Sequence, residues 1–332
     1  MLKAVGLVLF LIFSLIFLTA LVVLFYWTTC HPQKRRDLVP THCETDIDFV
    51  VTWVNSSDPA WIDKKCRYGA PGQFDSLRFG DGSVTNIEIE TCVKSILKYA
   101  PWCRKVWVAV DNQVPDFYKY LPQCDKKKVE IINHRDFFVD RDVLPVFNSH
   151  TIEANMYNIP GLANRFIYLN DDFCFSSPIR PSHFYDGDMP LYRSTCIVNM
   201  KRCPSIIPKI MFYLNPSSEV YIKATSNLSD YGNRLFIWRY SHHAVPLLRS
   251  YFNGPVCNSR FRGVEDIPPV HFAILNAIKN GWANMYSGKY ECLYLEKFRE
   301  NVDYSAYHEI CINSLNSVEE ATAFQRRILG LD

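Results

Sequence analysis

The chain has 332 residues, which is enough for one large domain or two closely joined lobes with a sizeable core. Hydrophobic residues make up 48% and charged residues 21%, a composition that excludes an intrinsically disordered chain. The 36 basic and 34 acidic side chains leave a formal net charge of +2, which is too weak to recruit nucleic acid through a general electrostatic field. No nucleic-acid partner is therefore expected.

The N-terminal segment is apolar. Residues 4–30 carry no charged side chain, and a helix of this length can cross a bilayer. We predict a retained transmembrane anchor over residues 1–30 and a polar stem over residues 31–46. A cleaved signal peptide is the alternative, although its apolar region usually spans only about 7 to 15 residues.

Two features bear on the orientation of this anchor and point in opposite directions. Lys34, Arg35 and Arg36 follow the apolar run, and taken alone they favour a cytosolic C-terminus. The 12 cysteines, none spaced as C-x-x-C, favour a compartment in which disulfides form, and we give them more weight. We expect a single-pass protein of the Golgi or another secretory-pathway membrane with a lumenal catalytic domain. Asn227 would then be a glycosylation site.

Strand-like and helix-like segments alternate after the stem. Apolar, β-branched runs predict strands at residues 47–54, 106–110, 129–132 and 166–169. Helices are predicted from a Thr85-x-x-Glu88 capping box to Pro101, after Pro115, and at residues 149–157. This rhythm predicts an α/β fold with a Rossmann-like parallel sheet flanked by helices.

The C-terminal half, from about residue 176, is more irregular. It contains several prolines and helical patterns at residues 271–279 and 318–329. No boundary separates the two halves, so residues 47–332 are interpreted as one catalytic domain.

Polar residues follow the predicted strands at the point where each strand ends. Parallel sheets bind ligands at the carboxyl ends of their strands, so these side chains are expected to converge on one edge. They are Asn55, Asp58, Asp111, His134, Asp171 and Asp172.

Asp171 and Asp172 form the most acidic of these strand ends. Carboxylate oxygens are the ligands that Mg²⁺ and Mn²⁺ prefer, and such an ion neutralises the charge of a diphosphate. The sequence therefore predicts that this turn holds a divalent metal ion against a nucleotide sugar. The alternative is a solvated turn that only caps a helix.

Three further groups are candidates for acid-base chemistry or phosphate binding. Glu153 lies in the helix before the last strand and is a candidate general base, with a solvated helix-face carboxylate as the alternative. His243, the second of a histidine pair, is a candidate proton carrier, although histidine pairs are more often structural. Arg262, close to Glu265 and Asp266, is a candidate phosphate ligand, and a surface ion-pair cluster is the alternative.

Several enzyme classes lack support because their motifs are missing. The sequence has no G-x-G-x-x-G, G-x-x-x-x-G-K-[ST], H-E-x-x-H or G-x-S-x-G motif. Dinucleotide oxidoreductases, P-loop enzymes, zincins and serine hydrolases are therefore not indicated.

Taken together, these segments resemble the Stealth family of sugar-phosphate transferases, which includes bacterial capsule-polymer enzymes and N-acetylglucosamine-1-phosphotransferase. Residues 47–55 with Asp58-Pro59 resemble the first conserved region. The second is matched by Arg78-Phe79 and by residues 94–102, 111–115 and 144–173. The third is looser, around His243 and Arg262, and the fourth is reduced to Cys311-Ile312-Asn313. The resemblance covers residues 46 to 314.

The resemblance implies transfer of a sugar-1-phosphate from a nucleotide-sugar donor to a glycan or glycoprotein acceptor, with a nucleoside monophosphate leaving. It implies catalytic or phosphate-contacting roles for Glu153, Asp172, His243 and Arg262. A metal site would include Asp171, Asp172 and Asn313. The resemblance also implies a cluster on the donor side, which consists of Trp53, Asn55, Asp58, Arg78, Asn148 and Ser149.

The chain departs from the family pattern at two positions. Lys94 stands where arginine is usual, and a lysine cannot replace a bidentate guanidinium contact. Ser314 stands where aspartate is expected, so one carboxylate of the site is missing. Two other functions therefore stay open: a metal-dependent glycosyltransferase that releases nucleoside diphosphate, and a non-catalytic glycan-binding descendant.

Overall fold

A computed structural model describes residues 46–69, 82–199, 235–240, 243–251, 257–263, 266, 268–286, 292–295, 297–312 and 315–331. The predicted anchor and stem, Arg78, Asn227, Glu265, Asn313 and Ser314 lie outside the described residues. The chain forms two compact units. The larger unit comprises residues 36–193, 241–285 and 289–332 and contains all the candidate site residues that the structure describes.

A five-stranded sheet forms the centre of the larger unit, in the order β3-β2-β1-β4-β9. These strands are β1 (Ile47–Thr52), β2 (Val106–Val110), β3 (Val129–Asn133), β4 (Arg165–Asn170) and β9 (Val245–Leu248). The first four are mutually parallel, as predicted. β9 is antiparallel to β4, so the prediction of a purely parallel sheet is wrong at this edge. Pro246 suits an edge strand, because proline donates no hydrogen bond to a further neighbour.

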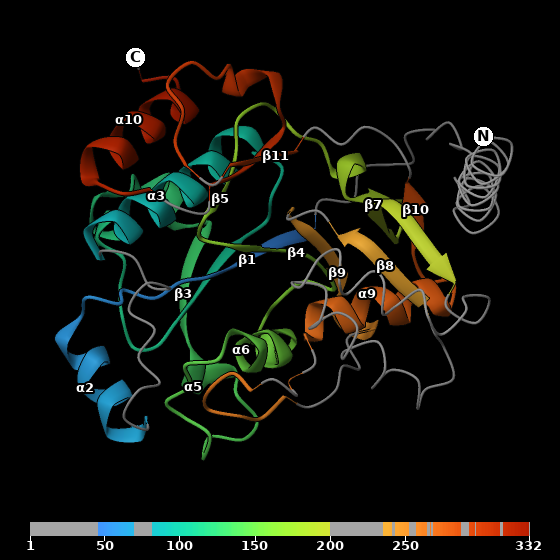
Figure 1. Ribbon diagram of the computed structural model, residues 1–332, viewed down its shortest axis with the longest axis horizontal. Helices are drawn as coiled ribbons and strands as arrows, with labels where there is room; N and C mark the ends of the chain where they lie inside the picture. The colour runs from blue at the N-terminus through green and yellow to red at the C-terminus, as the bar shows by residue number, and fades with distance from the viewer. Residues whose placement is uncertain are drawn as a thin grey trace, which may run out of the picture. The chain divides into compact units, whose positions relative to one another are not determined.

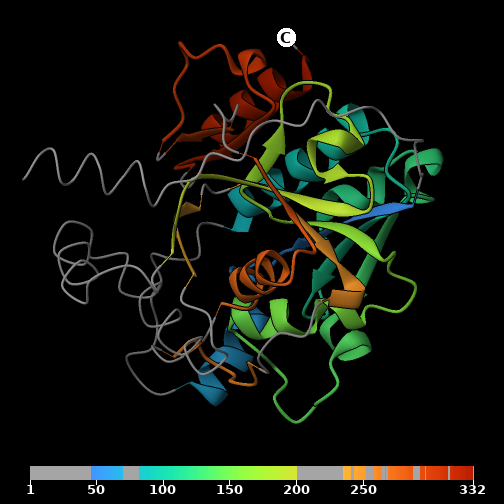
Figure 2. The ribbon, with the colours of Figure 1, turned by 90° about the vertical axis from the view of Figure 1, so that its right-hand side faces the viewer.

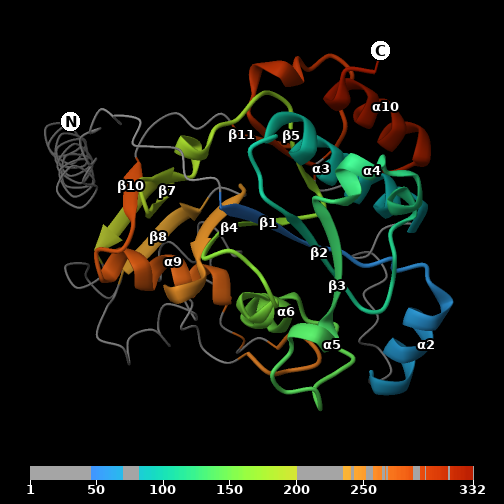
Figure 3. The ribbon, with the colours of Figure 1, turned by 180° about the vertical axis from the view of Figure 1, so that it is seen from behind.

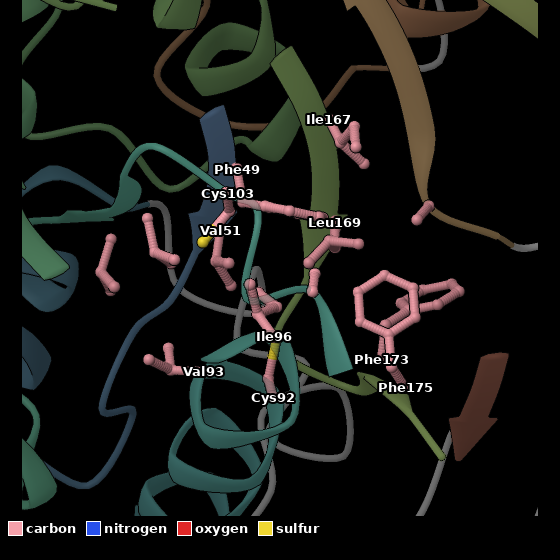
Figure 4. Packing of buried hydrophobic residues seen from close by; sticks show 14 of the residues in the cluster. Phe49, Val51, Cys92, Val93, Ile96, Cys103, Ile167, Leu169, Phe173 and Phe175 are labelled. Atoms are coloured by element: carbon pink, nitrogen blue, oxygen red, sulfur yellow. The ribbon is translucent and has the colours of Figure 1, made fainter. Parts of the chain in front are cut away.

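Helices cover both faces of this sheet (Figure 1). α3 (Gly82–Tyr99) and α10 (Val318–Leu329) lie on one side, and α5 (His134–Phe137), α6 (Ser149–Asn155) and α9 (Pro269–Lys279) lie on the other, as the view from behind also shows (Figure 3). Successive strand residues point to opposite faces. Phe49 and Val51 of β1 therefore pack with Ile96 of α3 in one buried cluster (Figure 4).

A second, three-stranded sheet has the order β11-β12-β5. Its strands are β5 (Phe173–Phe175), β11 (Cys292–Leu295) and β12 (Glu309–Ile312), and β12 is antiparallel to β5. β5 begins only three residues after β4 ends, so the turn at Asp171 and Asp172 lies between the two sheets. The predicted helices at residues 271–279 and 318–329 are confirmed as α9 and α10.

The remaining elements are further short helices and strands, and Figure 2 shows the ribbon from the side, with α10 in red near the C-terminus. These elements are α2 (Pro59–Tyr68), η1 (Asp116–Tyr120), α4 (Gln123–Lys126), η2 (Met156–Asn158), η3 (Pro181–His183), β6 (Tyr185–Asp186), β7 (Met189–Asn199), β8 (Leu235–Tyr240), η6 (Arg249–Tyr251), β10 (Asn284–Tyr286) and η7 (Tyr304–Ala306), where η marks a 3-10 helix. In the smaller unit, residues 194–199 of β7 pair antiparallel with β8.

The predicted start of α3 is wrong. The helix begins at Gly82, one turn before the proposed capping box, so Thr85 lies inside the helix. The Thr85 carbonyl accepts a hydrogen bond from Trp53 Nε1 at 3.1 Å. That bond explains why the local Thr-x-x-Glu pattern does not mark the boundary, because the end of β1 fixes the first turn instead.

Two expectations about the compartment can be compared with the described residues. Cys66, Cys92, Cys103, Cys124, Cys174, Cys257, Cys292 and Cys311 are free thiols, so the expected disulfides are not found among these eight cysteines. No helix in the described ranges is long and apolar enough to cross a bilayer, and residues 4–30 are not among those ranges.

Candidate functional site

The carboxyl ends of β1 and β2 are joined by the side chain of Gln113. Its Nε2 donates to the backbone carbonyl of Asn55 at 3.0 Å and to Asp58 Oδ2 at 2.9 Å. Its Oε1 accepts from the backbone N–H of Asn55 at 2.9 Å. The bond from Gln113 holds the pKa of Asp58 below its usual value. Asp58 Oδ1 caps the N-terminus of α2 by accepting from the Ala60 amide. Asn55 and Asp58, which both follow β1, are therefore held together by Gln113, which follows β2.

Asp111 and His134 follow β2 and β3 on the same edge. Asp111 forms an ion pair with Lys64 of α2 at 3.1 Å. His134 is buried, and burial lowers its pKa to about 4, so its ring is neutral at physiological pH. Neither ring nitrogen of His134 has a hydrogen-bond partner within the described part of the chain. His134 is therefore not a proton carrier near neutral pH.

Asp171 and Asp172 form an acidic turn directly after β4 and face Glu88 of α3. Burial and the charges of Glu88 and Asp172 raise the pKa of Asp171 well above its usual value. Burial raises the pKa of Asp172 to about 6, and burial together with Asp172 raises that of Glu88 to about 7. Asp172 Oδ2 accepts from the Cys311 thiol at 3.6 Å, whereas its buried Oδ1 has no partner among the described residues.

Glu88 was predicted only as a member of a capping box. The signal that could have found it is its place one turn before Cys92, because Cys92 belongs to the apolar stripe of α3 that faces the sheet. A carboxylate at the border of a buried apolar stripe is unusual and indicates a specific interaction with a nearby polar group or ligand.

The acidic turn can be compared with what a divalent cation requires. Within the described residues, no group of three or more histidine, cysteine, aspartate or glutamate side chains has the geometry of a metal cage. Mg²⁺ is commonly held by only one or two carboxylates, with waters and substrate phosphates completing its shell. Asp171 and Asp172, with the unpartnered Oδ1 of Asp172, fit that kind of site.

Glu153 of α6 is buried, with 9% of its surface exposed, on the face of the sheet opposite α3. Tyr168 OH donates to its Oε1 at 3.3 Å, and Tyr168 OH also lies 2.8 Å from Asn170 Oδ1. Burial raises the pKa of Glu153 to about 7, although the charge of Arg262, Tyr168 OH and the Val270 amide at the start of α9 lower it. Glu153 is thus a buried carboxyl group that changes charge near neutral pH, and it lies close enough to Arg262 to be affected by its charge.

Arg262 is exposed and donates a short hydrogen bond to Ser149 Oγ at the N-terminus of α6. Asn148 caps this helix, since its Oδ1 accepts from the His150 amide at 3.0 Å. Asn148 is fully buried, and its Nδ2 donates to Asp266 Oδ2 at 2.7 Å. Trp53 is also buried against α3. The side chains of Asn148 and Trp53 therefore contact other parts of the protein. Direct contact of either residue with the nucleotide sugar stays a prediction.

His243 lies beside the end of β4, because it precedes Val245 by two residues and Val245 pairs antiparallel with Tyr168. Its Nδ1 donates to the Ala244 carbonyl at 2.8 Å, which leaves Nε2 as the basic nitrogen. Ala244 N donates to the buried Glu309 Oε2 at 2.9 Å, so β12 fixes this segment. His243 therefore lies at the carboxyl edge of β4, and its predicted role as a proton carrier stays a prediction.

Lys94, which replaces the arginine usual in the family, lies on α3. Its Nζ pairs with Glu90 at 2.5 Å, one turn earlier on the same helix. The charge at this position is therefore directed along the helix and not into the acidic turn.

Comparisons with known proteins agree with the sequence motifs. A capsular polysaccharide phosphotransferase of Actinobacillus pleuropneumoniae, cps1A, is 33% identical over 219 residues, which cover 63% of this chain and 56% of the relative. Another, fcs1 of Haemophilus influenzae, is 27% identical over 312 residues and covers 82% and 79%. The chain thus matches little more than half of the length of the first relative.

The apo crystal structure of mouse xyloside xylosyltransferase 1 matches with a TM-score of 0.37 and 11% identity, over 80% of this chain and 96% of that chain. At this TM-score the likeness carries no conclusion about function.

Two family models match the chain in the order that the sequence predicts. Residues 45–70 match Stealth protein CR1, conserved region 1, and residues 84–193 match Stealth protein CR2, conserved region 2. The second match includes Glu153 and the acidic turn, whereas His243 and Arg262 lie beyond it. The chain therefore carries the first two conserved regions of the Stealth proteins, and the resemblance to this family is confirmed.

Proposed function

We propose that this protein transfers a hexose-1-phosphate or hexosamine-1-phosphate from a nucleotide sugar to a hydroxyl group of a glycan, forming a phosphodiester. UDP-N-acetylglucosamine is the first donor to test. The main support for the proposal is the environment of Glu153, a buried carboxyl group beside Arg262 with a pKa of about 7. Glu153 lies within the segment that matches a conserved region of the Stealth proteins. Two relatives are named capsular polysaccharide phosphotransferases, which supports a phosphate transfer of this kind.

Glu153 is suited to act as the general base. In the proposed step the acceptor oxygen attacks the phosphorus that bears the sugar, and its proton passes to Glu153 Oε1 or Oε2. The bond from that phosphorus to the bridging oxygen of the nucleotide breaks, and the nucleoside monophosphate leaves. A base whose pKa lies near the working pH is half ionised there and is still strong enough to accept the proton.

Arg262 and the acidic turn would neutralise the phosphates. A guanidinium group pairs with two phosphate oxygens at once, and Arg262 is exposed beside Glu153. Asp171 and Asp172 would hold Mg²⁺ or Mn²⁺, which when bound neutralises charge on the diphosphate. His243 Nε2 is the second candidate for the base.

The released nucleotide tests the reaction. Purified protein is incubated with a panel of nucleotide sugars and glycan acceptors, with Mg²⁺, with Mn²⁺ or with a chelator, and the products are identified by mass. A nucleoside monophosphate and a sugar phosphodiester are expected. Release of nucleoside diphosphate would contradict the proposal and indicate a glycosyltransferase. Donor binding without turnover for every acceptor would indicate a glycan-binding protein.

We also propose that residues 4–30 anchor the protein in a Golgi or other secretory-pathway membrane, with the catalytic domain in the lumen. The support is the length of the charge-free run and the sequon at Asn227. In membranes from expressing cells the protein should resist extraction at high pH and should be shielded from added protease. Digestion in sealed vesicles would show the opposite orientation, and extraction at high pH would exclude the anchor.

A further inference from the structure

The segment that carries Arg262 is held against α6 by an unusually dense set of contacts. We call residues 257–263 with Asp266 the arginine strap. Its backbone is joined to the segment before α6, since Phe147 N donates to Arg260 O at 2.8 Å. Thr151 Oγ1 of α6 donates to Ser259 O at 2.7 Å. These bonds fix the backbone of the strap at Ser259 and Arg260.

The two arginines of the strap are used differently. Arg260 Nε donates to the carbonyls of Val143 and Pro145, both at 3.0 Å, so Arg260 fastens the strap to the chain before α6. Arg262 instead extends to Ser149 Oγ and lies close enough to Glu153 to lower its pKa. Within the described residues, Arg260 thus holds the strap in place, whereas Arg262 contacts Ser149 and acts on Glu153.

Asp266 connects the residues on either side of the Arg262–Ser149 contact. Its Oδ2 accepts from Gly263 N at 2.9 Å, the residue after Arg262, and from Asn148 Nδ2 at 2.7 Å, the residue before Ser149. Its Oδ1 accepts from Ser259 Oγ at 3.0 Å. A single carboxylate oxygen thus fixes the neighbours of both members of the contact.

Among the described residues, the hydrogen-bond donors to Asp266 are the backbone N–H of Gly263, the side-chain amide of Asn148 and the hydroxyl of Ser259, all of them neutral. A carboxylate that serves only to balance surface charge would be expected beside a cation. Hydrogen bonds from neutral donors to an ionised group are directional and stronger than those between neutral groups, so they restrict geometry. This arrangement suits a role in placing Arg262.

We propose that Asp266 is a positioning residue that holds Arg262 over the N-terminus of α6, where it can bind the phosphates of the donor. This inference rests on the proposed function. Reaction rates depend steeply on placement, and a displacement of about 1 Å in a positioned group can reduce the rate roughly 100-fold.

A double-mutant cycle tests the proposal with the full chain. The wild type, Asp266→Asn, Arg262→Ala and the double variant are compared in two measurements: kcat for nucleotide release and the Kd for UDP by titration calorimetry. Asp266→Asn should lower kcat roughly 10- to 100-fold and weaken UDP binding. In the Arg262→Ala background, the same change should have an effect of less than about twofold, because the group that Asp266 places is already gone.

Asp140→Asn is the matched control. Asp140 Oδ2 accepts from Asn258 Nδ2 of the same strap at 2.6 Å, but Asp140 is exposed and its partner Asn258 is four residues before Arg262. Its replacement should leave kcat and UDP binding within about twofold of the wild type, since exposed contacts are worth little.

Equal losses from Asp266→Asn with and without Arg262 would overturn the proposal, because a purely structural role gives independent effects. An Asp266→Asn variant with wild-type kcat and UDP binding would also overturn it. Ser259→Ala, which removes only one donor, replaces Asp266→Asn in the cycle if the latter does not fold. If the wild type released no monophosphate but bound UDP, the proposed reaction would fail while the UDP cycle still decided the role of Asp266. A wild type that neither binds UDP nor turns over donor overturns both.

Discussion

The carboxylates at the two ends of the parallel sheet differ in how many hydrogen bonds their oxygens accept. At the amino end, Asp48 of β1 is fully buried, and its oxygens accept from Arg104 Nε at 2.9 Å, Trp107 Nε1 at 2.9 Å and Ala163 N at 2.9 Å, among other donors. At the carboxyl end, Asp172 receives one thiol contact, and its Oδ1 has no partner within the described ranges.

The difference is consistent with a structural role for Asp48 and with the proposed metal-binding role of Asp172. A buried charge is tolerated when hydrogen bonds and an opposite charge replace its lost hydration. Asp48 meets this requirement within the protein, and it ties β1 to the residues that precede β2 and β4. Within the described residues Asp172 and Glu88 have no such compensation, and burial raises the pKa of both. Such under-satisfied groups gather where a ligand will complete them.

The sharpest way to break this comparison is to remove a carboxylate at each end. Asp172→Asn should lower kcat about 100- to 1,000-fold, the scale expected when a group that stabilises transition-state charge is lost. The melting temperature at pH 7.5 without metal should not fall, because the amide removes an ionised group from a site where burial disfavours it. Both are measured on the same preparation by nucleotide release and thermal unfolding. Retained metal-dependent turnover would show that the centre lies elsewhere.

The opposite result is expected at the amino end. Asp48→Asn should lower the free energy of unfolding by about 3 kcal/mol, because it leaves Arg104 and several buried donors without a charged partner. The kcat of the folded fraction should stay within about twofold. Urea unfolding and active-site-normalised rates measure the two effects.

Glu130→Gln is the control for Asp48→Asn. It removes the ion pair between Lys105 and Glu130, whose side chains are 31% and 48% exposed, and an exposed pair contributes at most about 1 kcal/mol. A loss of stability in Glu130→Gln equal to that in Asp48→Asn would contradict the structural role given to the buried carboxylate.

The same contrast explains which parts of the fold could be predicted from the sequence. The strands β1 to β4 and the helices α9 and α10 were predictable because each is a local apolar pattern. The helix α2 was missed because Lys65 occupies its buried face and packs its ammonium group over Trp61, so the apolar periodicity is interrupted. The strand β9 was missed because of Pro246, which is tolerated at a sheet edge.

Site residues could be predicted where they directly follow a strand, and could not be predicted where they depend on contacts between distant segments. Asp171 and Asp172 follow a recognisable strand, and Glu153 belongs to a family motif. Glu88 meets the acidic turn, and Asp266 meets Asn148, only because the fold brings distant segments together. No local pattern encodes those pairings.

The pH dependence of Glu153 sharpens the comparison further. Its pKa in the folded protein, about 7, exceeds the usual value of 4.5, so the native state holds the proton more tightly than the unfolded chain. Its contribution to stability is complete below about pH 4.5 and is lost as the pH rises through 7, by roughly 3 kcal/mol. Activity should change in the opposite direction, since kcat/KM rises as Glu153 ionises through about pH 7.

Urea unfolding between pH 5 and 8 and a kcat/KM profile over the same range measure these two trends. Glu153→Gln should flatten the stability trend that Glu153 causes. A variant with the same slope as the wild type would show that another group titrates in this range.

The smallest expected effect separates two carboxylates that lie on the same helix. Glu88 faces Asp171 and Asp172, whereas Glu90 is partly exposed and pairs with Lys94. At pH 7.5 without metal, Glu88→Gln should raise the free energy of unfolding by about 1 kcal/mol, because it removes one of three neighbouring carboxyl groups whose ionisation burial and mutual repulsion disfavour.

Glu90→Gln should lower the free energy of unfolding by at most about 0.5 kcal/mol, the usual contribution of an ion pair one turn apart on a helix. Urea unfolding of both variants in the same buffer measures the difference. Added Mg²⁺ should stabilise the wild type more than Glu88→Gln, because the cation relieves a repulsion that the variant has already reduced. Equal stabilisation of both proteins by Mg²⁺ would place the cation away from Glu88 and weaken the contrast between the two ends of the sheet.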